Sequence, residues 1–198
     1  MEAGLIVIIC SYLIGSVPFG LLFSKVFGGP DPRKNGSQNI GFTNVLRVCG
    51  KKAGIFTLLG DMGKGFFVTE MGKYLGFSWT WILMFGLAVI IGHIFSLFLA
   101  FRGGKGVATA LGAIGGLHSL IGLTLIGIWL FSVFIFRYSS SGALVAFGAF
   151  PLCVIGFGGD MAFLFFSFLV TGLIFYCHKG NIKRLYHGVE PKIGSARN

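Results

Sequence analysis

Long apolar runs, separated by short polar segments that hold most of the basic residues, constrain this chain more than any other feature. Hydrophobic residues make up 55% of its 198 residues, and charged residues make up 11%. A soluble domain carries about 25% charged residues, so this chain has too few charges to cover a water-facing surface. The sequence therefore predicts an all-α integral membrane protein.

Seven apolar runs are expected to be transmembrane helices, and together they make up one membrane-embedded domain, residues 1–198. A spanning helix needs about 20 apolar residues, or fewer where protein surrounds it. The first span is expected to kink at Pro18. The fourth is short, so it either crosses a thinned bilayer or is re-entrant. The predicted spans are residues 3–27, 53–75, 78–101, 107–117, 119–136, 142–157 and 161–177.

The distribution of lysine and arginine predicts the orientation of these spans. With seven spans, 13 of the 16 basic residues fall on one side, and the loops of the other side hold only Lys73. Positively charged loops face the cytoplasm, so the N-terminus is expected outside and the C-terminus inside. A re-entrant fourth segment would change this parity. The 13 residues are Arg33, Lys34, Arg47, Lys51, Lys52, Arg102, Lys105, Arg137, Lys179, Lys183, Arg184, Lys192 and Arg197.

A glycine-rich turn, FRGGKG, follows the third predicted span. It contains Arg102, Gly103, Gly104, Lys105 and Gly106, and a helical pattern opens at the next residue. Glycines let successive N–H groups converge on an anion, and a helix N-terminus adds further donors. The turn is therefore a candidate phosphate site; the alternative is an ordinary tight turn with positive flanks. It is not a Walker loop, because Gly106 stands where Ser or Thr would follow the lysine.

The longest polar segment, residues 28–52, is expected to be a loop that lies on the membrane surface around a ligand. Arg47 offers a planar guanidinium fork suited to phosphate or carboxylate. The alternative is a solvated loop in which Ser and Asn form turns. Short hydrogen-bonding side chains are dense in this segment: Ser37, Asn39, Thr43 and Asn44.

Two charged residues interrupt the second predicted span. Asp61 and Lys64 lie about one helical turn apart, which permits a local ion pair. Charges within a span are costly and usually face a cavity or each other. Both a structural pair and a direct functional role are compatible with this spacing. His93, in the third span, is expected to be a buried, hydrogen-bonded histidine rather than a catalyst.

The polar tail after the last span holds a candidate base. His178 lies at the inner end of that span, and an imidazole titrates near neutrality and can accept a proton. Asn181 and Arg184 follow at three-residue spacing, so they share a face with His178 if the helix continues. Glu190 is the one carboxylate that could orient the ring. The alternative is a basic tail bound to anionic lipid headgroups.

Several other chemistries lack the residues that they need in this sequence. The four cysteines are scattered and form no CxxC pair, so neither zinc nor a disulfide framework is indicated. The motifs HxxxxD, HExxH and GxSxG are absent. The net charge of +10 lies mostly in short loops between apolar runs, which indicates orientation and phosphate binding rather than nucleic-acid binding. No metal, cofactor or nucleic acid is expected.

Five segments, spread over nearly the whole chain, carry a family resemblance. Three are SQNIGFTNVLR at 37–47, FRGGKGVAT at 101–109, and HKGNIKRL at 178–185 with Gly188 and Glu190; GSVPFG at 15–20 and DMGKG at 61–65 are the others. They resemble the PlsY family, the bacterial acyl-phosphate:glycerol-3-phosphate acyltransferases. The first segment departs from the family pattern: Gln38 stands where Gly is common, Ile40 where Pro is common, and Phe42 where a small residue is common.

The resemblance implies an enzyme that transfers a fatty acyl group from acyl phosphate to the 1-hydroxyl of glycerol 3-phosphate, giving lysophosphatidate and phosphate. It implies the first step of phospholipid synthesis, at the cytoplasmic face of the bacterial inner membrane. The expected catalytic residues are Ser37, Lys105, His178 and Asn181. The expected substrate-binding residues are Ser37, Asn39, Thr43, Asn44, Arg47, Arg102, Gly103, Gly104, Lys105, Gly106, His178, Asn181, Arg184 and Glu190.

Two questions stay open at this point. The base that deprotonates the hydroxyl is either His178 or a phosphate oxygen of a substrate. The rival function is a small transporter or channel for phosphorylated metabolites, which would need a polar path across the whole bilayer; here the outer side is poor in polar groups. A lipid-binding structural protein would leave the three motifs unexplained. Membrane lipids are expected around the chain, and a monomer is the simplest expectation.

Overall fold

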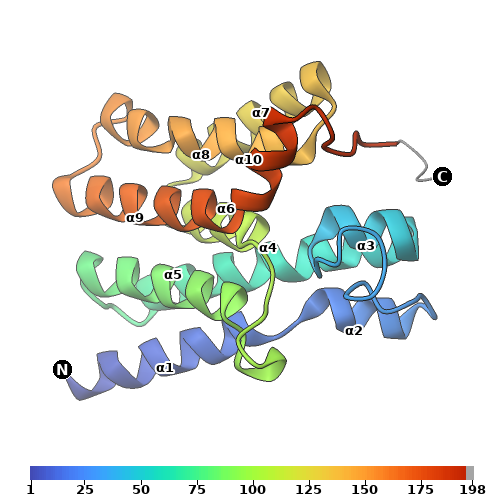
Figure 1. Cartoon of the computed structure of the whole chain (residues 1–198). Helices are drawn as coiled ribbons and strands as arrows, with labels where there is room; N and C mark the ends of the chain where they lie inside the picture. Colours follow the sequence, from blue (N-terminus) through green and yellow to red (C-terminus); the bar gives the residue numbers. More distant parts are fainter. Residues whose placement is uncertain (195–198) are drawn as a thin grey trace. The chain divides into compact units, whose positions relative to one another are not determined.

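The computed structural model describes residues 1–194, and they form helices and connecting segments without a β-strand. This agrees with the predicted all-α class. Arg197, one of the basic residues counted for orientation, lies outside the described part. The chain divides into two compact units, Met1–His118 and Ser119–Asn198, whose helices are labelled in Figure 1. Each unit is described by itself.

The first unit contains six α-helices and one short 3-10 helix. Within it, α1 packs against α5, and α4 packs against both α3 and α6. The elements are α1 (Glu2–Ser16), α2 (Phe19–Val26), α3 (Phe42–Cys49), α4 (Lys51–Tyr74), α5 (Trp79–Ile94), η1 (Leu97–Leu99) and α6 (Val107–Leu117).

The first predicted span is interrupted at Val17 and Pro18, where a kink was expected. Val17 adopts an extended conformation (φ −60°, ψ 118°), which is the conformation that a following proline favours. The Ser16 backbone carbonyl, just before the break, accepts a hydrogen bond from the Ser96 hydroxyl at 2.6 Å. This break therefore lies against the C-terminal end of α5, and it leaves backbone carbonyls available to side chains of other helices.

Small residues allow α4 and α6 to cross closely. A Cβ at Gly65 would overlap the Thr109 carbonyl oxygen, and one at Gly112 would overlap the Met62 carbonyl oxygen. Membrane helices commonly use small residues to bring their backbones together in this way. The crossing lies between the charged residues of α4 and the first turns of α6, so it fixes the helix that follows the glycine-rich turn.

The second unit contains four helices: α7 (Ser119–Phe136), α8 (Ser139–Gly156), α9 (Met161–Cys177) and α10 (Lys179–Tyr186). Phe147, Phe150, Phe163 and Phe166 pack between α8 and α9, with ring centroids 5.9–6.4 Å apart. α9 and α10 meet at a bend of 62°. Past α10 the tail returns to the start of α8, where the Ile193 N–H donates to the Arg137 carbonyl at 2.7 Å.

Four segments among the described residues are long and apolar enough to cross a membrane: Glu2–Val26, Trp79–Leu99, Ser119–Phe136 and Ser139–Gly156. The bent pair α9 and α10 would add a fifth. α4 is interrupted by charged residues, and α6 has only 11 residues. The helices therefore support a multi-pass membrane protein, while the count of seven spans and their orientation stay predictions.

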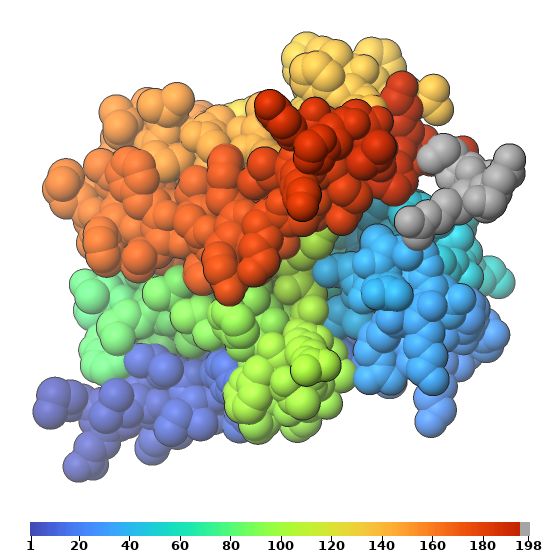
Figure 2. Space-filling model, in the orientation of Figure 1, coloured from blue at the N-terminus to red at the C-terminus, as the bar shows by residue number. Residues whose placement is uncertain are grey.

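Three predicted segments contain a helix or a helix end that was not expected. The polar segment 28–52 was expected to be a loop, yet it contains α3, in which Asn44 and Val45 turn to the protein interior. The third predicted span, 78–101, ends its α-helix at Ile94 and continues as η1. Figure 2 shows the segment around η1 at the surface of the first unit. The tail, in which a continued helix was one of two alternatives, bends at His178 and then forms α10.

Candidate functional site

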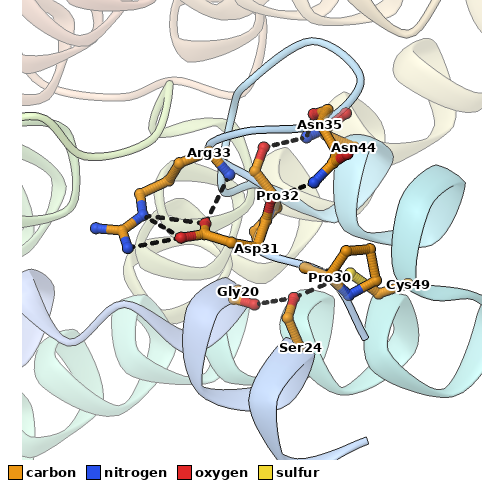
Figure 3. Close-up of polar contacts among 9 residues, drawn as sticks. All are labelled: Gly20, Ser24, Pro30, Asp31, Pro32, Arg33, Asn35, Asn44 and Cys49. Carbon is orange, nitrogen blue, oxygen red and sulfur yellow. Dashed lines mark hydrogen bonds and ion pairs between the residues drawn. The ribbon is translucent and has the colours of Figure 1, made fainter. Parts of the chain in front are cut away.

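The polar segment before α3 is folded around the side chain of Asn44. This residue is only 2% exposed, and it lies in the first turn of α3. Its Oδ1 accepts the Ser37 N–H at 2.8 Å. Its Nδ2 donates to the carbonyls of Pro32 at 2.9 Å and Asn39 at 2.8 Å, and lies 3.1 Å from that of Asn35. Figure 3 shows Asn44 reaching back to Pro32 and Asn35. The polar atoms of Asn44 thus hold the loop, and its expected contact with substrate stays a prediction.

Other contacts in Figure 3 brace the same segment. The Arg33 guanidinium forms an ion pair with the Asp31 carboxylate at 2.7 Å, and its hydrogen bonds hold the pKa of Asp31 below the usual value. The Ser24 hydroxyl donates to the Gly20 carbonyl at 2.6 Å and lies 3.2 Å from the Cys49 sulfur. The Cys49 sulfur also lies 3.2 Å from the Pro30 carbonyl oxygen, so Cys49 ties α3 to both α2 and the loop.

Gln38 occupies a backbone conformation that favours glycine. Its φ is +60°, in the left-handed region, which costs a residue with a side chain about 1–2 kcal/mol. The family resemblance places a glycine at this position, and the structure gives the physical reason for that preference. At the next residue an Asx turn begins, in which Asn39 Oδ1 accepts the Gly41 N–H at 2.8 Å.

The remaining polar residues of this segment stand close to the loop. Ser37 is exposed, and Thr43 and Arg47 are half-buried on α3. A spacing of four residues places Thr43 and Arg47 on one face of the helix. The Thr43 hydroxyl and the Arg47 guanidinium therefore lie on the same face of α3 in the first unit, and both are group types that can donate to an oxyanion.

The glycine-rich turn differs from the expected anion cradle. The Gly103 N–H donates to the Ile94 carbonyl at 2.9 Å, and the Gly104 N–H donates to the His93 carbonyl at 3.0 Å. Both N–H groups therefore bind the end of α5, so they do not converge on an anion. The N–H groups at the start of α6, which begins at Val107 after Gly106 in a left-handed conformation (φ +83°), are the helix-terminal donors near Lys105.

Three polar side chains meet beneath this turn, inside the first unit. Lys64 Nζ lies 2.9 Å from Asp61 Oδ1 and 2.9 Å from His93 Nδ1. It also donates to the Val17 carbonyl at 3.0 Å, at the break between α1 and α2. The predicted Asp61–Lys64 ion pair and the predicted burial of His93 are both confirmed; the three side chains are 2–4% exposed.

Glu190 organises the polar residues of the second unit. Its carboxylate accepts hydrogen bonds from Asn181 Nδ2 at 2.6 Å, Ser140 Oγ at 2.7 Å and Arg184 Nε at 2.7 Å. Burial alone would raise the pKa of Glu190, but these three donors outweigh it and hold the pKa below its usual value. Asn181 and Arg184 share a face of α10, as their spacing predicted. Ser140 was missed; the run of serines at 139–141 was its only signal.

His178 lies at the bend between α9 and α10 and is 3% exposed. Its Nδ1 lies 2.8 Å from the Ile174 carbonyl oxygen. Because a carbonyl oxygen can only accept, Nδ1 carries the proton of the neutral ring and Nε2 carries the lone pair. The group that orients Nδ1 is thus a backbone carbonyl, whereas Glu190, the carboxylate considered for that task, receives Ser140, Asn181 and Arg184.

Among residues 1–194 no group of three or more His, Cys, Asp or Glu side chains is arranged to hold a metal ion. The four cysteines, Cys10, Cys49, Cys153 and Cys177, form no disulfide bond. The polar sites of both units are therefore built from hydrogen-bond donors, basic side chains and single carboxylates.

Apolar helices of spanning length that bury clusters of ionisable side chains define a class: a multi-pass membrane protein with polar sites in its interior. A family model described as glycerol-3-phosphate acyltransferase matches residues 5–188. The chain belongs to this family.

Relatives and solved structures agree with that family. A glycerol-3-phosphate acyltransferase of Dechloromonas aromatica is 45% identical and covers 97% of each chain. That of Lawsonia intracellularis is 44% identical and covers 96% of each. The crystal structure of PlsY (YgiH), an integral membrane glycerol 3-phosphate acyltransferase, is similar in its glycerol 3-phosphate form, with a TM-score of 0.92, 36% identity, and coverage of 97% of this chain and 96% of that one. Its lysophosphatidic acid form has a TM-score of 0.90 and 35% identity.

Proposed function

We propose that this protein transfers a fatty acyl group from acyl phosphate to the 1-hydroxyl of glycerol 3-phosphate, and releases lysophosphatidate and inorganic phosphate. The observation that carries the proposal is the likeness, over 97% of this chain, to a membrane acyltransferase solved in a glycerol 3-phosphate form and a lysophosphatidic acid form. One molecule is the acceptor of this reaction and the other is its product. Acyl phosphate as donor is the finer part of the proposal and follows from the motif resemblance.

The chemistry requires a nucleophile, a base and stabilised negative charge. The glycerol hydroxyl oxygen attacks the acyl carbon, the bond from that carbon to the phosphate oxygen breaks, and phosphate leaves. The hydroxyl proton passes either to His178 or to a phosphate oxygen of a substrate. His178 Nε2 has the lone pair that a base needs, because Nδ1 is held by the Ile174 carbonyl.

The phosphate groups of both substrates need hydrogen-bond donors and positive charge, and we propose that three polar segments supply them. The first segment contains Ser37, Thr43 and Arg47. The second contains Arg102, Lys105 and the start of α6. The third contains His178, Asn181 and Arg184. Arginine and lysine bind phosphate through charge-assisted hydrogen bonds. We assign Asn44 and Glu190 to shaping their segments, because their polar atoms are bonded to loop and helix groups.

The proposed setting is one domain of seven spans in the bacterial inner membrane, with the N-terminus outside and the reaction at the cytoplasmic face. This setting suits a donor with a long acyl chain in the bilayer and a soluble acceptor that arrives from the cytoplasm.

The test is to incubate the purified protein with acyl phosphate and glycerol 3-phosphate and to measure both products. Lysophosphatidate and phosphate are expected in equal amounts. A parallel reaction with acyl-CoA in place of acyl phosphate should give no product. Product from acyl-CoA alone would overturn the proposed donor, and no product from either donor would overturn the proposed reaction.

A further inference from the structure

His93 contacts the glycine-rich turn twice. Its backbone carbonyl accepts the Gly104 N–H at 3.0 Å. Its ring fills the space beside the Gly104 Cα: the three atoms that a Cβ at Gly104 would meet are Nε2, Cε1 and Cδ2 of His93. The φ of Gly104 lies outside the left-handed region, so a side chain there is opposed by this ring and not by backbone strain. The turn thus rests directly on the His93 imidazole.

The other edge of the ring is held by the buried ion pair. His93 Nδ1 lies 2.9 Å from Lys64 Nζ and 3.3 Å from Asp61 Oδ1. An ammonium group can only donate, so Nδ1 accepts from Lys64 and the ring proton sits on Nε2. Lys64 is itself placed by Asp61 and by the Val17 carbonyl, at 2.9 and 3.0 Å. Groups from α4, α5 and the break between α1 and α2 therefore fix the orientation of one ring.

An ion pair with no other task would need only Asp61 and Lys64, which lie on the same helix. Burying a third polar side chain between them and the turn costs free energy in a span. The arrangement is explained if the ion pair fixes the His93 ring and the ring, by contact, fixes the turn. We infer that His93 is a positioning residue for the proposed acyl transfer. Lys64 and Asp61 hold its ring, and the ring sets the position of the Gly103–Gly104 backbone and therefore of Lys105. The inference rests on the proposed function.

A double-mutant cycle between positions 93 and 104 tests this role. Gly104→Ala should collide with the ring and lower kcat/KM about tenfold or more, within the range of coupling between contacting residues. His93→Asn keeps an acceptor near Lys64 but removes Nε2 and Cε1, the two ring atoms closest to the new Cβ. In the His93→Asn background, the further loss caused by Gly104→Ala should shrink to less than about threefold. His93→Ala serves as a second background if His93→Asn does not fold.

Gly103→Ala is the matched control. A Cβ at Gly103 would meet the backbone carbonyls of His93 and Ile94, and no change of the His93 side chain removes those atoms. Its loss of kcat/KM should therefore be the same with histidine or asparagine at position 93. If His93→Asn also reduced the loss of kcat/KM caused by Gly103→Ala, the whole region would have loosened. That result would overturn the positioning role.

Two further readouts separate positioning from stability. Melting temperatures in detergent show whether each variant is folded, and KM for each phosphate-bearing substrate shows whether the turn has moved. If His93 positions the turn, Gly104→Ala should raise KM for one of the two substrates, while the melting temperature of the variant stays nearly unchanged. Equal effects of Gly104→Ala in both backgrounds, in an enzyme whose wild type acylates glycerol 3-phosphate, would overturn this inference alone. A wild type without that activity would overturn the proposed function first.

Discussion

Asn44→Ala is expected to unfold the polar loop before α3 while leaving the helices in place. The Asn44 side chain has one acceptor and two donor protons, and the structure engages all of them with the backbone of Pro32, Ser37 and Asn39. Each such hydrogen bond contributes about 1 kcal/mol net. Loss of three therefore destabilises the ordered loop by about 3 kcal/mol, which is about 150-fold in its population.

Hydrogen exchange and steady-state kinetics measure this effect. The Ser37 N–H should lose protection in Asn44→Ala by up to about 150-fold, and kcat/KM should fall with it if the loop serves the reaction. Asn35→Ala is the control: its side chain makes one exposed hydrogen bond, to the Asp31 carbonyl at 2.9 Å, and the Asn35 backbone carbonyl that faces Asn44 is kept. It should stay within about threefold of wild type. Unchanged exchange at Ser37 in Asn44→Ala would refute the reasoning.

Four other outcomes are expected. Lys105→Ala should lose a charge-assisted contact and reduce binding or rate about 10- to 150-fold, measured by initial rates; full activity in folded protein would place the phosphate elsewhere. His178→Gln should keep much activity if a substrate phosphate is the base, and lose about 10²–10⁴-fold if His178 is; single-turnover rates with intact substrate binding decide. The pKa of Glu190 is lower in the folded protein than its usual 4.5, so its stabilising contribution is present above about pH 4.5 and lost as pH falls below it; melting temperatures should show this acid-side loss, and Glu190→Gln should remove it. A reporter fused after Asn198 should be active only inside the cell; external activity would contradict the orientation.

Much of the helical pattern could be predicted because apolar runs end at polar or glycine-containing breaks. Three helices, Val107–Leu117, Ser119–Phe136 and Met161–Cys177, begin and end at the predicted residues, since each is bounded by residues that do not continue an apolar helix. α3 was missed for the opposite reason. Its apolar residues Phe42, Val45, Leu46 and Cys49 do recur at helical spacing, but the helix has only eight residues and lies within the polar segment that was interpreted as a loop.

The candidate site was predicted at the level of residue type but not of contact. The sequence showed Asn44 and Glu190 to be polar residues in motif segments; which groups they bind depends on how the chain folds back. Asn44 satisfies carbonyls five to 12 residues before it, and Glu190 reaches Ser140, which is 50 residues away. Buried polar groups must find partners, but sequence spacing does not say which ones.

The glycines of the glycine-rich turn have a different physical role from the one that the sequence suggested. Glycine at 103 and 104 was expected to aim N–H groups at a phosphate, whereas both N–H groups bind carbonyls at the end of α5. The absence of a side chain matters instead because the His93 ring and carbonyl occupy the space that a Cβ would fill. A bulky change such as Gly104→Val would be harmful under either explanation, so it cannot separate them. Only a change that removes the ring distinguishes the two, since it relieves a collision with His93 but could not restore a blocked approach of phosphate to the backbone.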